Sequence, residues 1–444
     1  DIVEAVVASY KSPVTGYSVF DGGRLWVGND RFTKYDVQTS RNRLGRAWIK
    51  DERDAFVAPP QVIGDTLYHL RRRKDSPAFT AAAIQGDDGK LLWEVDLAVP
   101  APLLAVDMQR KLVYSVSAQA ELYEVTPEVF QTGAVDQPAA AAGGTARGKP
   151  FTEVQMLDQG RWALASPQDR GRVVIYDPNA ATPSGRLRDV LLKAAGTAQV
   201  TATPVFCNGG LIAPLDNGQV LLLDAATGDN KFLPFQPPVE AGSKVAWGRP
   251  AAVGAEQREF VIADDRRKLF RVGVKDQPEP HLAAASQAQL EVDIVSPLAT
   301  AGDTVYGITR GPNSDTVLSF AAADLAVGKE WPLEGRAVWG PEPSDDLVLV
   351  ATDRQTLLAF EAGQKQRWTS PLAYGPLVGR PLRVNGNLAL ASLSGTVWMI
   401  SGQDGKELAK ADVGEPLGAG PVAFGTRLLL SAADGTLLVI RGLQ

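Results

Sequence analysis

The sequence has little of the chemistry that most often marks metal sites and covalent catalysis. Its 444 residues include one cysteine, Cys207, and two histidines, His69 and His281. One cysteine cannot form an intrachain disulfide or a cysteine-based metal site. The two histidines lie far apart in the sequence, which argues against a histidine-based metal site. We therefore expect structural or surface roles for these three residues, and we predict neither a metal site nor a cofactor.

Long apolar runs are also missing. No run approaches the roughly 20 apolar residues that span a bilayer, so we expect no direct membrane span. The first residues, Asp1-Ile-Val-Glu, lack the basic start and the apolar stretch of a signal peptide. Because the chain begins without methionine, we interpret it as a mature or trimmed product, which permits an exported origin. The mild net charge of −6 argues against general nucleic-acid binding, although it leaves room for a local basic patch.

What the sequence does contain is a repeat of short apolar runs separated by tight turns. Residues 420–441 (GPVAFGTRLLLSAADGTLLVIR) show three runs separated by Gly-Thr and Asp-Gly, a pattern typical of successive antiparallel strands. Ten copies align on the first apolar residue of the second strand, 40 to 50 residues apart. This period, with short runs and alternation, favours β-propeller blades over helical repeats. The ten anchors are Leu25, Leu67, Leu112, Trp162, Leu211, Phe260, Val305, Leu347, Leu388 and Leu428.

Most copies can be divided into four strands. A proline often opens the first strand, where no ladder donor is needed. We therefore predict an all-β fold, a single β-propeller domain over residues 1–444 with four-stranded antiparallel blades and about ten repeats (eight to ten blades). Residues 127–150 are rich in Ala, Gly and Pro and lack strand character, so we expect a flexible insertion there. Two propellers, or a smaller ring with irregular flanking blades, are the alternatives.

The two ends of the chain predict how the ring closes. Residues Glu4 to Leu25 align without gaps with Glu407 to Leu428, at a constant offset of 403. Residues 4–10 thus correspond to a fourth strand, whereas the last copy stops after its third strand at Arg441. We predict that residues 4–10 pair with residues 437–441, which would complete the last blade and leave no open sheet edge between the ends.

The copies resemble the quinoprotein-like, or PQQ-like, propeller repeat. The resemblance is carried by Thr203-Pro204-Val205, by residues 217–220 (NGQV) and 223–229 (LDAATGD), and by residues 84–93 (IQGDDGKLLW). It extends over essentially the whole chain and implies the propeller fold. WD40 repeats are the alternative, but their Gly-His and Trp-Asp signatures are missing.

The same family includes two kinds of protein. Its alcohol and sugar dehydrogenases use a quinone cofactor and calcium, and its non-enzymatic members, such as an outer-membrane assembly lipoprotein, are interaction platforms. This chain lacks the adjacent cysteine pair of the methanol-dehydrogenase type and a matching calcium and base set. The resemblance therefore favours the non-enzymatic members, and it implies a periplasmic or other extracytoplasmic location.

Aspartate and arginine recur in the turns between the second and third strands. A ring of carboxylates or a calcium site is one interpretation of the aspartates, but turn chemistry is the simpler one because aspartate caps its own turn. The cations would lie on one rim of the ring, where arginine can bind carboxylates or phosphates; a solvated rim is the alternative. The aspartates are Asp30, Asp75, Asp169, Asp216, Asp264, Asp265, Asp315, Asp353 and Asp434. The predicted partner-binding residues are Arg71, Arg72, Arg73, Lys74, Arg266, Arg267, Arg310 and Arg354.

Two further patterns bear on these interpretations. Residues 71–74 are four successive cations where a short hairpin tip is expected, which makes them the strongest single binding hypothesis. Trp93, Trp331 and Trp368 lie late in their copies, where we expect them to pack between blades.

Together these observations predict a non-catalytic protein-interaction or scaffold propeller of the bacterial cell envelope. Its expected partners are other proteins, and the sequence leaves its oligomeric state open. One alternative is a quinone-dependent dehydrogenase-like or other enzyme with a site in the central funnel. Another is the ligand-sensing ectodomain of a larger protein.

Overall fold

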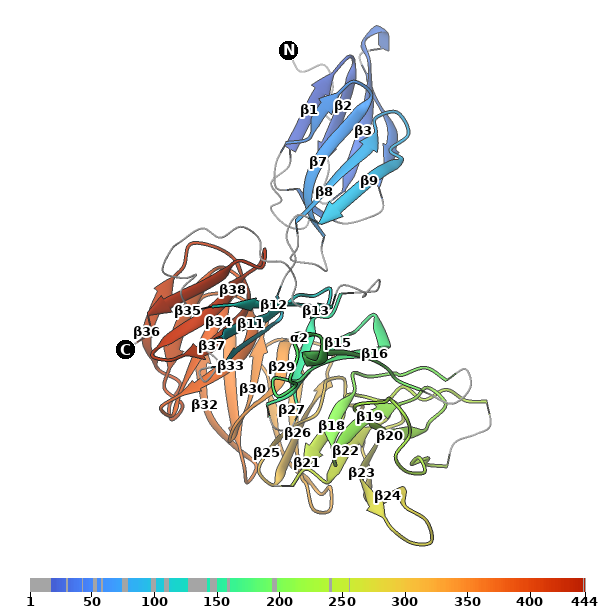
Figure 1. The fold of residues 1–444 in the computed structure, drawn as a ribbon, viewed down its shortest axis with the longest axis vertical. Helices are drawn as coiled ribbons and strands as arrows, with labels where there is room; N and C mark the ends of the chain where they lie inside the picture. The colour runs from blue at the N-terminus through green and yellow to red at the C-terminus, as the bar shows by residue number, and fades with distance from the viewer. Residues whose placement is uncertain are drawn as a thin grey trace. The chain divides into compact units, whose positions relative to one another are not determined.

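The computed structural model in Figure 1 is built almost entirely of antiparallel β-strands. It describes residues 17–28, 31–41, 43–50, 54–56, 59–73, 79–96, 101–107, 112–126, 142–143, 150–157, 160–193, 198–238, 242–254, 256–441 and 443. The chain divides into two compact units. Unit 1 comprises Asp1–Pro100 with Ala433–Thr436, and unit 2 comprises Ala101–Ala432 with Leu437–Gln444.

Unit 1 contains two sheets among its described residues. The first has the order β1 (Tyr17–Asp21), β2 (Arg24–Gly28), β3 (Phe32–Gln38) and β4 (Arg43–Ile49), with a 3-10 turn η1 (Thr39–Arg41) before β4. In the second, β7 (Thr66–Arg73), β8 (Phe79–Gln85) and β9 (Leu91–Asp96) follow one another, and both β5 (Asp54–Phe56) and β6 (Gln61–Ile63) pair with β7. Trp26, Phe32 and Leu67 form the buried centre between the two sheets.

Unit 2 contains eight sheets in its described residues, each in simple sequence order. The first four are β10 (Leu103–Asp107), β11 (Leu112–Val116), β12 (Glu121–Val125), β13 (Ala142–Gly143); β14 (Glu153–Met156), β15 (Trp162–Ser166), β16 (Asp169–Tyr176), β17 (Leu187–Leu191); β18 (Val205–Cys207), β19 (Gly210–Pro214), β20 (Val220–Asp224); and β21 (Ala251–Val253), β22 (Glu259–Ala263), β23 (Lys268–Lys275), β24 (His281–Gln289). A helical turn, α2 (Pro183–Arg186), precedes β17.

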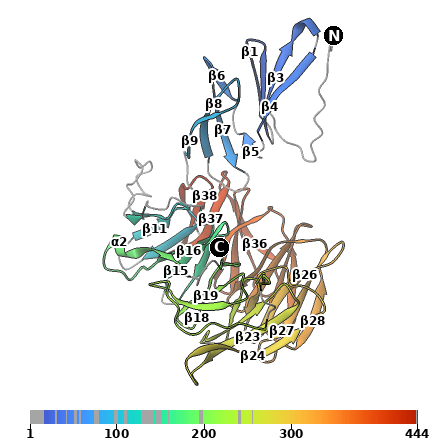
Figure 2. The ribbon, with the colours of Figure 1, turned by 90° about the vertical axis from the view of Figure 1, so that its right-hand side faces the viewer.

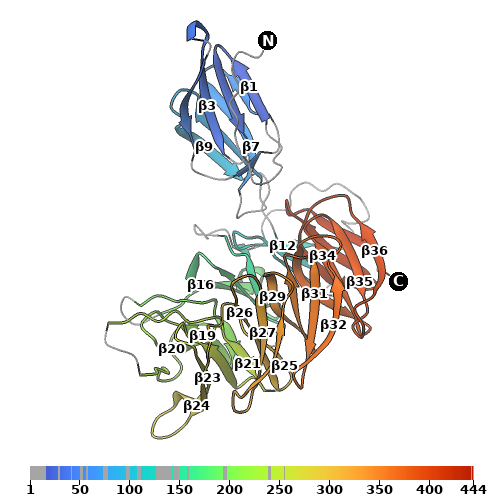
Figure 3. The ribbon, with the colours of Figure 1, turned by 180° about the vertical axis from the view of Figure 1, so that it is seen from behind.

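The other four sheets continue the same pattern. They are β25 (Ala299–Ala301), β26 (Thr304–Arg310), β27 (Asp315–Ala321), β28 (Val327–Pro332); β29 (Ala337–Ser344), β30 (Leu347–Thr352), β31 (Thr356–Glu361), β32 (Lys365–Pro371); β33 (Leu377–Val384), β34 (Asn387–Ser392), β35 (Thr396–Ile400), β36 (Glu407–Asp412); and β37 (Leu417–Phe424), β38 (Arg427–Ala432), β39 (Leu437–Arg441). Seen from behind in Figure 3, β25–β28, β29–β32 and β33–β36 follow one another side by side.

The core of unit 2 lies between successive sheets. In β30, Leu347 and Leu349 pack against the following sheet, whereas Val348 and Val350 pack against the preceding one. Because side chains alternate between the two faces of a strand, a strand covered on both faces must be apolar at nearly every position. This is why the second strands are continuous apolar runs in the sequence.

The first and last sheets of unit 2 also share a hydrophobic cluster. Leu104 and Val113 pack with Leu429, and Val439 lies against the same cluster. Figures 1 and 2 show β11 close to β37 and β38. Each of the eight sheets thus shares a cluster with the next one, and the eighth shares one with the first.

The repeat deduced from the sequence agrees with the described strands. Each of the ten anchors lies in the second strand of its own sheet, if β5 and β6 are taken together as the first strand of theirs. The closing strand predicted for residues 4–10 lies outside the described residues. The single domain over 1–444 and the number of blades in one ring stay predictions.

The expectation that residues 127–150 lack strand character is corrected at two of its residues. Residues 142 and 143, inside the segment 127–150, form β13 and pair with Leu122 and Glu121 of β12. Ala142 and Gly143 add little apolar area, so the sequence shows no strand signal there, but their backbone groups can still complete a sheet edge. Most of the segment lies outside the described residues.

Candidate interaction surface

Four predicted arginines lie at the same connection in three successive sheets of unit 2. Arg266 and Arg267 are in the turn between β22 and β23, Arg310 is the last residue of β26, and Arg354 is in the turn between β30 and β31. These are the connections between second and third strands that the repeat predicts. We call these four residues the arginine rim.

Residues 71–74 differ from the expected hairpin tip. Arg71 to Arg73 belong to β7, where their backbones pair with residues 54–56 of β5. Arg71 Nη2 also forms an ion pair of 2.8 Å with Glu94 Oε2 on β9. The predicted tip position was wrong because β7 continues through these cations as a paired strand. Lys74 lies outside the described residues, and binding by this segment stays a prediction.

A linker between sheets connects the parts of the rim. The amide of Leu290 donates to the Arg267 carbonyl at 2.7 Å, and Arg267 Nε lies 3.5 Å from Asp293 Oδ1. Further along, the amide of Val295 donates to the Ile308 carbonyl at 2.8 Å. These contacts tie the β22–β23 turn to the end of β26, where Arg310 is found.

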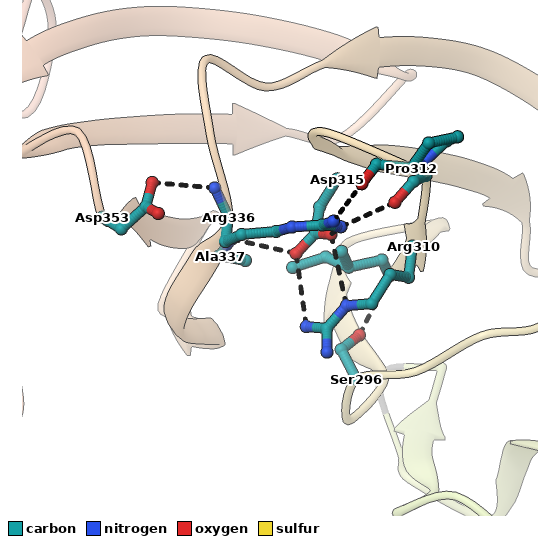
Figure 4. Close-up of polar contacts among 9 residues, drawn as sticks. Ser296, Arg310, Pro312, Asp315, Arg336, Ala337 and Asp353 are labelled. Carbon is teal, nitrogen blue, oxygen red and sulfur yellow. Dashed lines mark hydrogen bonds and ion pairs between the residues drawn. The ribbon is translucent and has the colours of Figure 1, made fainter.

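A buried carboxylate holds the next part of the rim (Figure 4). Asp315 begins β27, and its side chain is fully buried. Its Oδ1 accepts a hydrogen bond of 2.7 Å from Arg336 Nη1, and its Oδ2 accepts one of 3.0 Å from the Ala337 amide. Arg310 approaches the same carboxylate less closely, with Nε 3.4 Å from Oδ1 and Nη2 3.5 Å from Oδ2. Two guanidinium groups therefore share one carboxylate.

Burial and hydrogen bonding act in opposite directions on Asp315. Burial favours the neutral acid, but the hydrogen bonds from Arg336, the Ala337 amide and Arg310 outweigh it and hold the pKa of Asp315 below its ordinary value. Asp315 is consequently ionised at neutral pH and compensates part of the charge of its two arginines.

Arg336 is fixed at several points. Its guanidinium donates to the carbonyls of Gly311 and Pro312 at 2.7 Å each, and its backbone amide donates to Asp353 Oδ1 at 2.8 Å. The preceding residue, Gly335, has a φ of +100°, and a Cβ there would lie 2.1 Å from Asp353 Oδ1. Glycine is therefore required for the linker to approach the β30–β31 turn this closely.

Arg336 was not among the predicted binding residues. Those residues lie in the turns within each copy, whereas Arg336 lies in the linker between two sheets. The one local signal is the glycine before it.

Five of the turn aspartates, Asp315 and Asp353 above among them, accept backbone hydrogen bonds. Asp264 Oδ1 accepts from the Arg266 and Lys268 amides, Asp434 Oδ1 from the Thr436 amide, and Asp216 Oδ1 from the Gln199 amide. This is the turn and linker chemistry expected of aspartate. Across the described ranges, no group of three or more His, Cys, Asp or Glu side chains could hold a metal ion.

His69 and Cys207 are both held in the neutral state by burial. His69 packs against Phe32 and Phe56 at ring distances of 5.2 and 5.5 Å. Burial lowers its pKa to about 4, with a further contribution from the charge of Arg71. Burial also raises the pKa of the Cys207 thiol to about 12, and Sγ lies 3.0 Å from the Gln257 carbonyl oxygen. Neither group is suited to act as a nucleophile or general base at neutral pH.

The three late tryptophans divide into two groups. Trp368 is buried and donates from Nε1 to the Gly402 carbonyl of the next sheet, and Trp331 packs against Phe360 at 5.1 Å, as the repeat predicts. Trp93 instead is 47% exposed. The expectation of inter-blade burial is therefore wrong for Trp93. β9, β28 and β32 are each the last strand of their sheet, but β28 and β32 are followed by a sheet that packs on their tryptophan, whereas the described residues of unit 1 contain no third sheet after β9.

None of the helices in the described residues is long and apolar enough to cross a membrane.

Comparisons with known proteins bear on the fold. No protein-family model matches this sequence, and no curated protein matches it. Among solved structures, BamB from Moraxella catarrhalis is similar at 13% identity, with 87% of this chain and 99% of that chain covered and a TM-score of 0.40. Citrobacter koseri AztD is similar at 13% identity, with coverages of 85% and 98% and a TM-score of 0.46. The computationally designed Ika8 protein is similar at 12% identity, with coverages of 78% and 96% and a TM-score of 0.51.

Identities of 12 to 13% leave function open, and of these three structures only Ika8 reaches a TM-score above 0.5. The fold-level conclusion rests on the sheets themselves: antiparallel sheets, most of them four-stranded, follow one another and share hydrophobic clusters, so the chain has an all-β, β-propeller fold.

Proposed function

We propose that this chain is a non-catalytic β-propeller that binds another protein through the arginine rim, as a scaffold of the bacterial cell envelope. The observation that carries the proposal is the continuity of the rim. Three successive sheets present arginines at the same connection, and Asp293, Asp315 and Arg336 join these connections. Arginine is enriched at protein interfaces because its planar fork binds carboxylates and backbone carbonyls.

A fixed scaffold lowers the cost of binding. The linker of residues 333–337 is held by the Asp315 carboxylate and by Asp353, so little of its backbone freedom would be lost when a partner docks. The shared clusters between successive sheets support a closed eight-bladed ring in unit 2, which would keep the rim at a constant curvature.

Two further parts of the proposal have separate supports. The neutral, buried states of Cys207 and His69 support a role without catalysis by these two residues. The envelope, and with it an extracytoplasmic location, rests on the resemblance of the repeats to the quinoprotein-like family. An absorption spectrum after addition of pyrroloquinoline quinone and Ca²⁺ tests the proposed non-catalytic role, because a bound quinone chromophore would contradict it.

The binding experiment uses two double variants of the full chain. Arg310→Gln with Arg354→Gln removes two rim charges; glutamine is chosen because a glutamate at 310 would repel Asp315. Arg258→Gln with Arg427→Gln is the matched control. Both arginines are exposed and lie at connections between first and second strands, at the opposite end of the strands from the rim connections.

We expect proteins captured from a bacterial envelope extract to include at least one that the parent and the control retain and the rim variant loses. That protein, once purified, should bind the parent and the control directly and bind the rim variant at least about tenfold more weakly. Identical capture by all three proteins would refute the proposed function.

A further inference from the structure

One charge at the arginine rim is only partly compensated within the described residues. Asp315 makes its two short contacts with Arg336 and the Ala337 amide, at 2.7 and 3.0 Å. Arg310 has only the longer contacts of 3.4 and 3.5 Å to the same carboxylate, and its side chain is 57% exposed. Its guanidinium can therefore donate to a second carboxylate in the bidentate geometry that arginine prefers.

Two exposed aliphatic side chains lie in the linker whose backbone pairs with the end of β26, where Arg310 is found. Val292 and Val295 are 45% and 49% exposed, in the linker that leads to β25. The bridge between Ile294 and Thr309, and the hydrogen bond from the Val295 amide to Ile308, hold this linker against the end of β26. An apolar side chain of a partner could cover these two valines, as in the apolar core of a protein interface.

We infer that the arginine rim binds a protein segment in which carboxylates alternate with aliphatic side chains, with a carboxylate on Arg310 and an aliphatic side chain on Val292 and Val295. This inference rests on the proposed function and names the chemistry of its partner. The mixed charge of the rim favours such a segment over a phosphate-rich polymer, because Asp265, Asp293 and Asp353 would repel successive phosphates. The valines, moreover, would gain nothing from phosphate.

The test uses three fluorescein-labelled peptides and fluorescence anisotropy at low salt. The first alternates glutamate and leucine, the second replaces glutamate by glutamine, and the third replaces leucine by serine. We expect only the first peptide to bind the parent with a Kd below about 1 mM. Arg310→Gln and Val295→Ser should each weaken that binding, Arg310→Gln by about tenfold, because a charge-assisted hydrogen bond is lost. Arg258→Gln should bind like the parent.

Several results would overturn the inference. Equal binding of the glutamine peptide would remove the role of the carboxylate, and equal binding of the serine peptide would remove that of the valines. An unchanged affinity in Arg310→Gln would place the peptide elsewhere. Val295→Ser keeps Arg310 and Asp315 intact, so it tests the surface even if Arg310→Gln folds poorly.

This failure can be told apart from failure of the proposed function. If a captured protein depends on the rim but an excess of the glutamate–leucine peptide does not displace it, the proposed function stands and the inference about its partner is refuted.

Discussion

Replacing Asp315 by asparagine should weaken the hydrogen bonds that hold Arg336 and the Ala337 amide. Asparagine has the same shape but puts an NH2 group in place of one carboxylate oxygen. In the parent both oxygens accept, Oδ1 from Arg336 and Oδ2 from the Ala337 amide. Whichever way the new amide turns, its NH2 group faces a donor, and one hydrogen bond must be lost.

The size of the effect follows from those contacts. A lost charge-assisted hydrogen bond and an unsatisfied donor each cost about 1–3 kcal/mol. Arg336 is 31% exposed and Arg310 is 57% exposed, so water can partly replace the lost carboxylate, which lowers the sum. We expect a loss of about 2–3 kcal/mol in the local free energy of opening.

Native-state hydrogen exchange followed by mass spectrometry measures this loss. Peptides covering residues 333–340 contain the Ala337 amide, and a loss of this size should speed its exchange by roughly 30- to 150-fold. Asp353→Asn is the matched control. Within the described part of the chain, the exposed Asp353 side chain accepts one hydrogen bond, from the Arg336 amide. Asparagine can still accept it, so we expect exchange to speed up by less than about threefold. Similar exchange in the two variants would refute the reasoning.

The same carboxylate gives a dependence on pH. The pKa of Asp315 is lower in the folded protein than its ordinary value of about 3.9. Its contribution to stability is therefore fully present above about pH 4 and is lost as pH falls through the folded-state pKa. Protection at residues 333–340 should fall with acidification in the parent and fall less in Asp315→Asn. Parallel curves would contradict this.

Two further substitutions test one position in each unit, His69 in unit 1 and Gly379 in unit 2. The pKa of His69 is lowered from 6.5 to about 4, so the unfolded state takes up a proton at a higher pH than the folded state does. The free energy of unfolding should therefore fall by up to about 3 kcal/mol as the pH is lowered from 6.5 toward 4. His69→Phe should flatten this dependence in urea titrations of unit 1 fluorescence, and an unchanged pH slope would contradict it. In unit 2, a Cβ on Gly379 (φ +65°) would lie 2.2 Å from the Gly420 carbonyl oxygen, whereas Gly386 (φ +83°) has open space around it. Gly379→Ala should therefore lower the free energy of unfolding by at least about 2 kcal/mol more than Gly386→Ala, and equal urea midpoints would show that the backbones can separate.

Local patterns predicted local structure well. Leu347 to Val350 could be identified as a strand covered on both faces because every residue in the run is apolar, and the turn at Asp264 could be predicted because aspartate stabilises such turns. The same logic failed where tertiary contacts outweighed it. Arg71 to Arg73 form a paired strand despite their charge, and Ala142 pairs with β12 without any apolar signal.

Only part of the candidate site could be predicted from the sequence. The sequence placed Arg266, Arg267, Arg310 and Arg354 in equivalent connections, because each follows the second strand of its copy. It did not indicate Arg336, whose side chain meets Asp315 from the next sheet, 21 residues away. A contact of this kind depends on how two sheets pack, and no local spacing encodes it.

By itself the sequence determined the repeat, the strand order within each sheet and the turns that carry charge, since these follow from the alternation of side chains and the needs of tight turns. The tertiary structure decided which sheets share a core and which arginine Asp315 binds most closely. An apolar face specifies that it must be buried but not what will cover it. The cluster of Leu104, Val113 and Leu429 joins residues more than 300 positions apart, and it exists only because unit 2 brings its first and last sheets together.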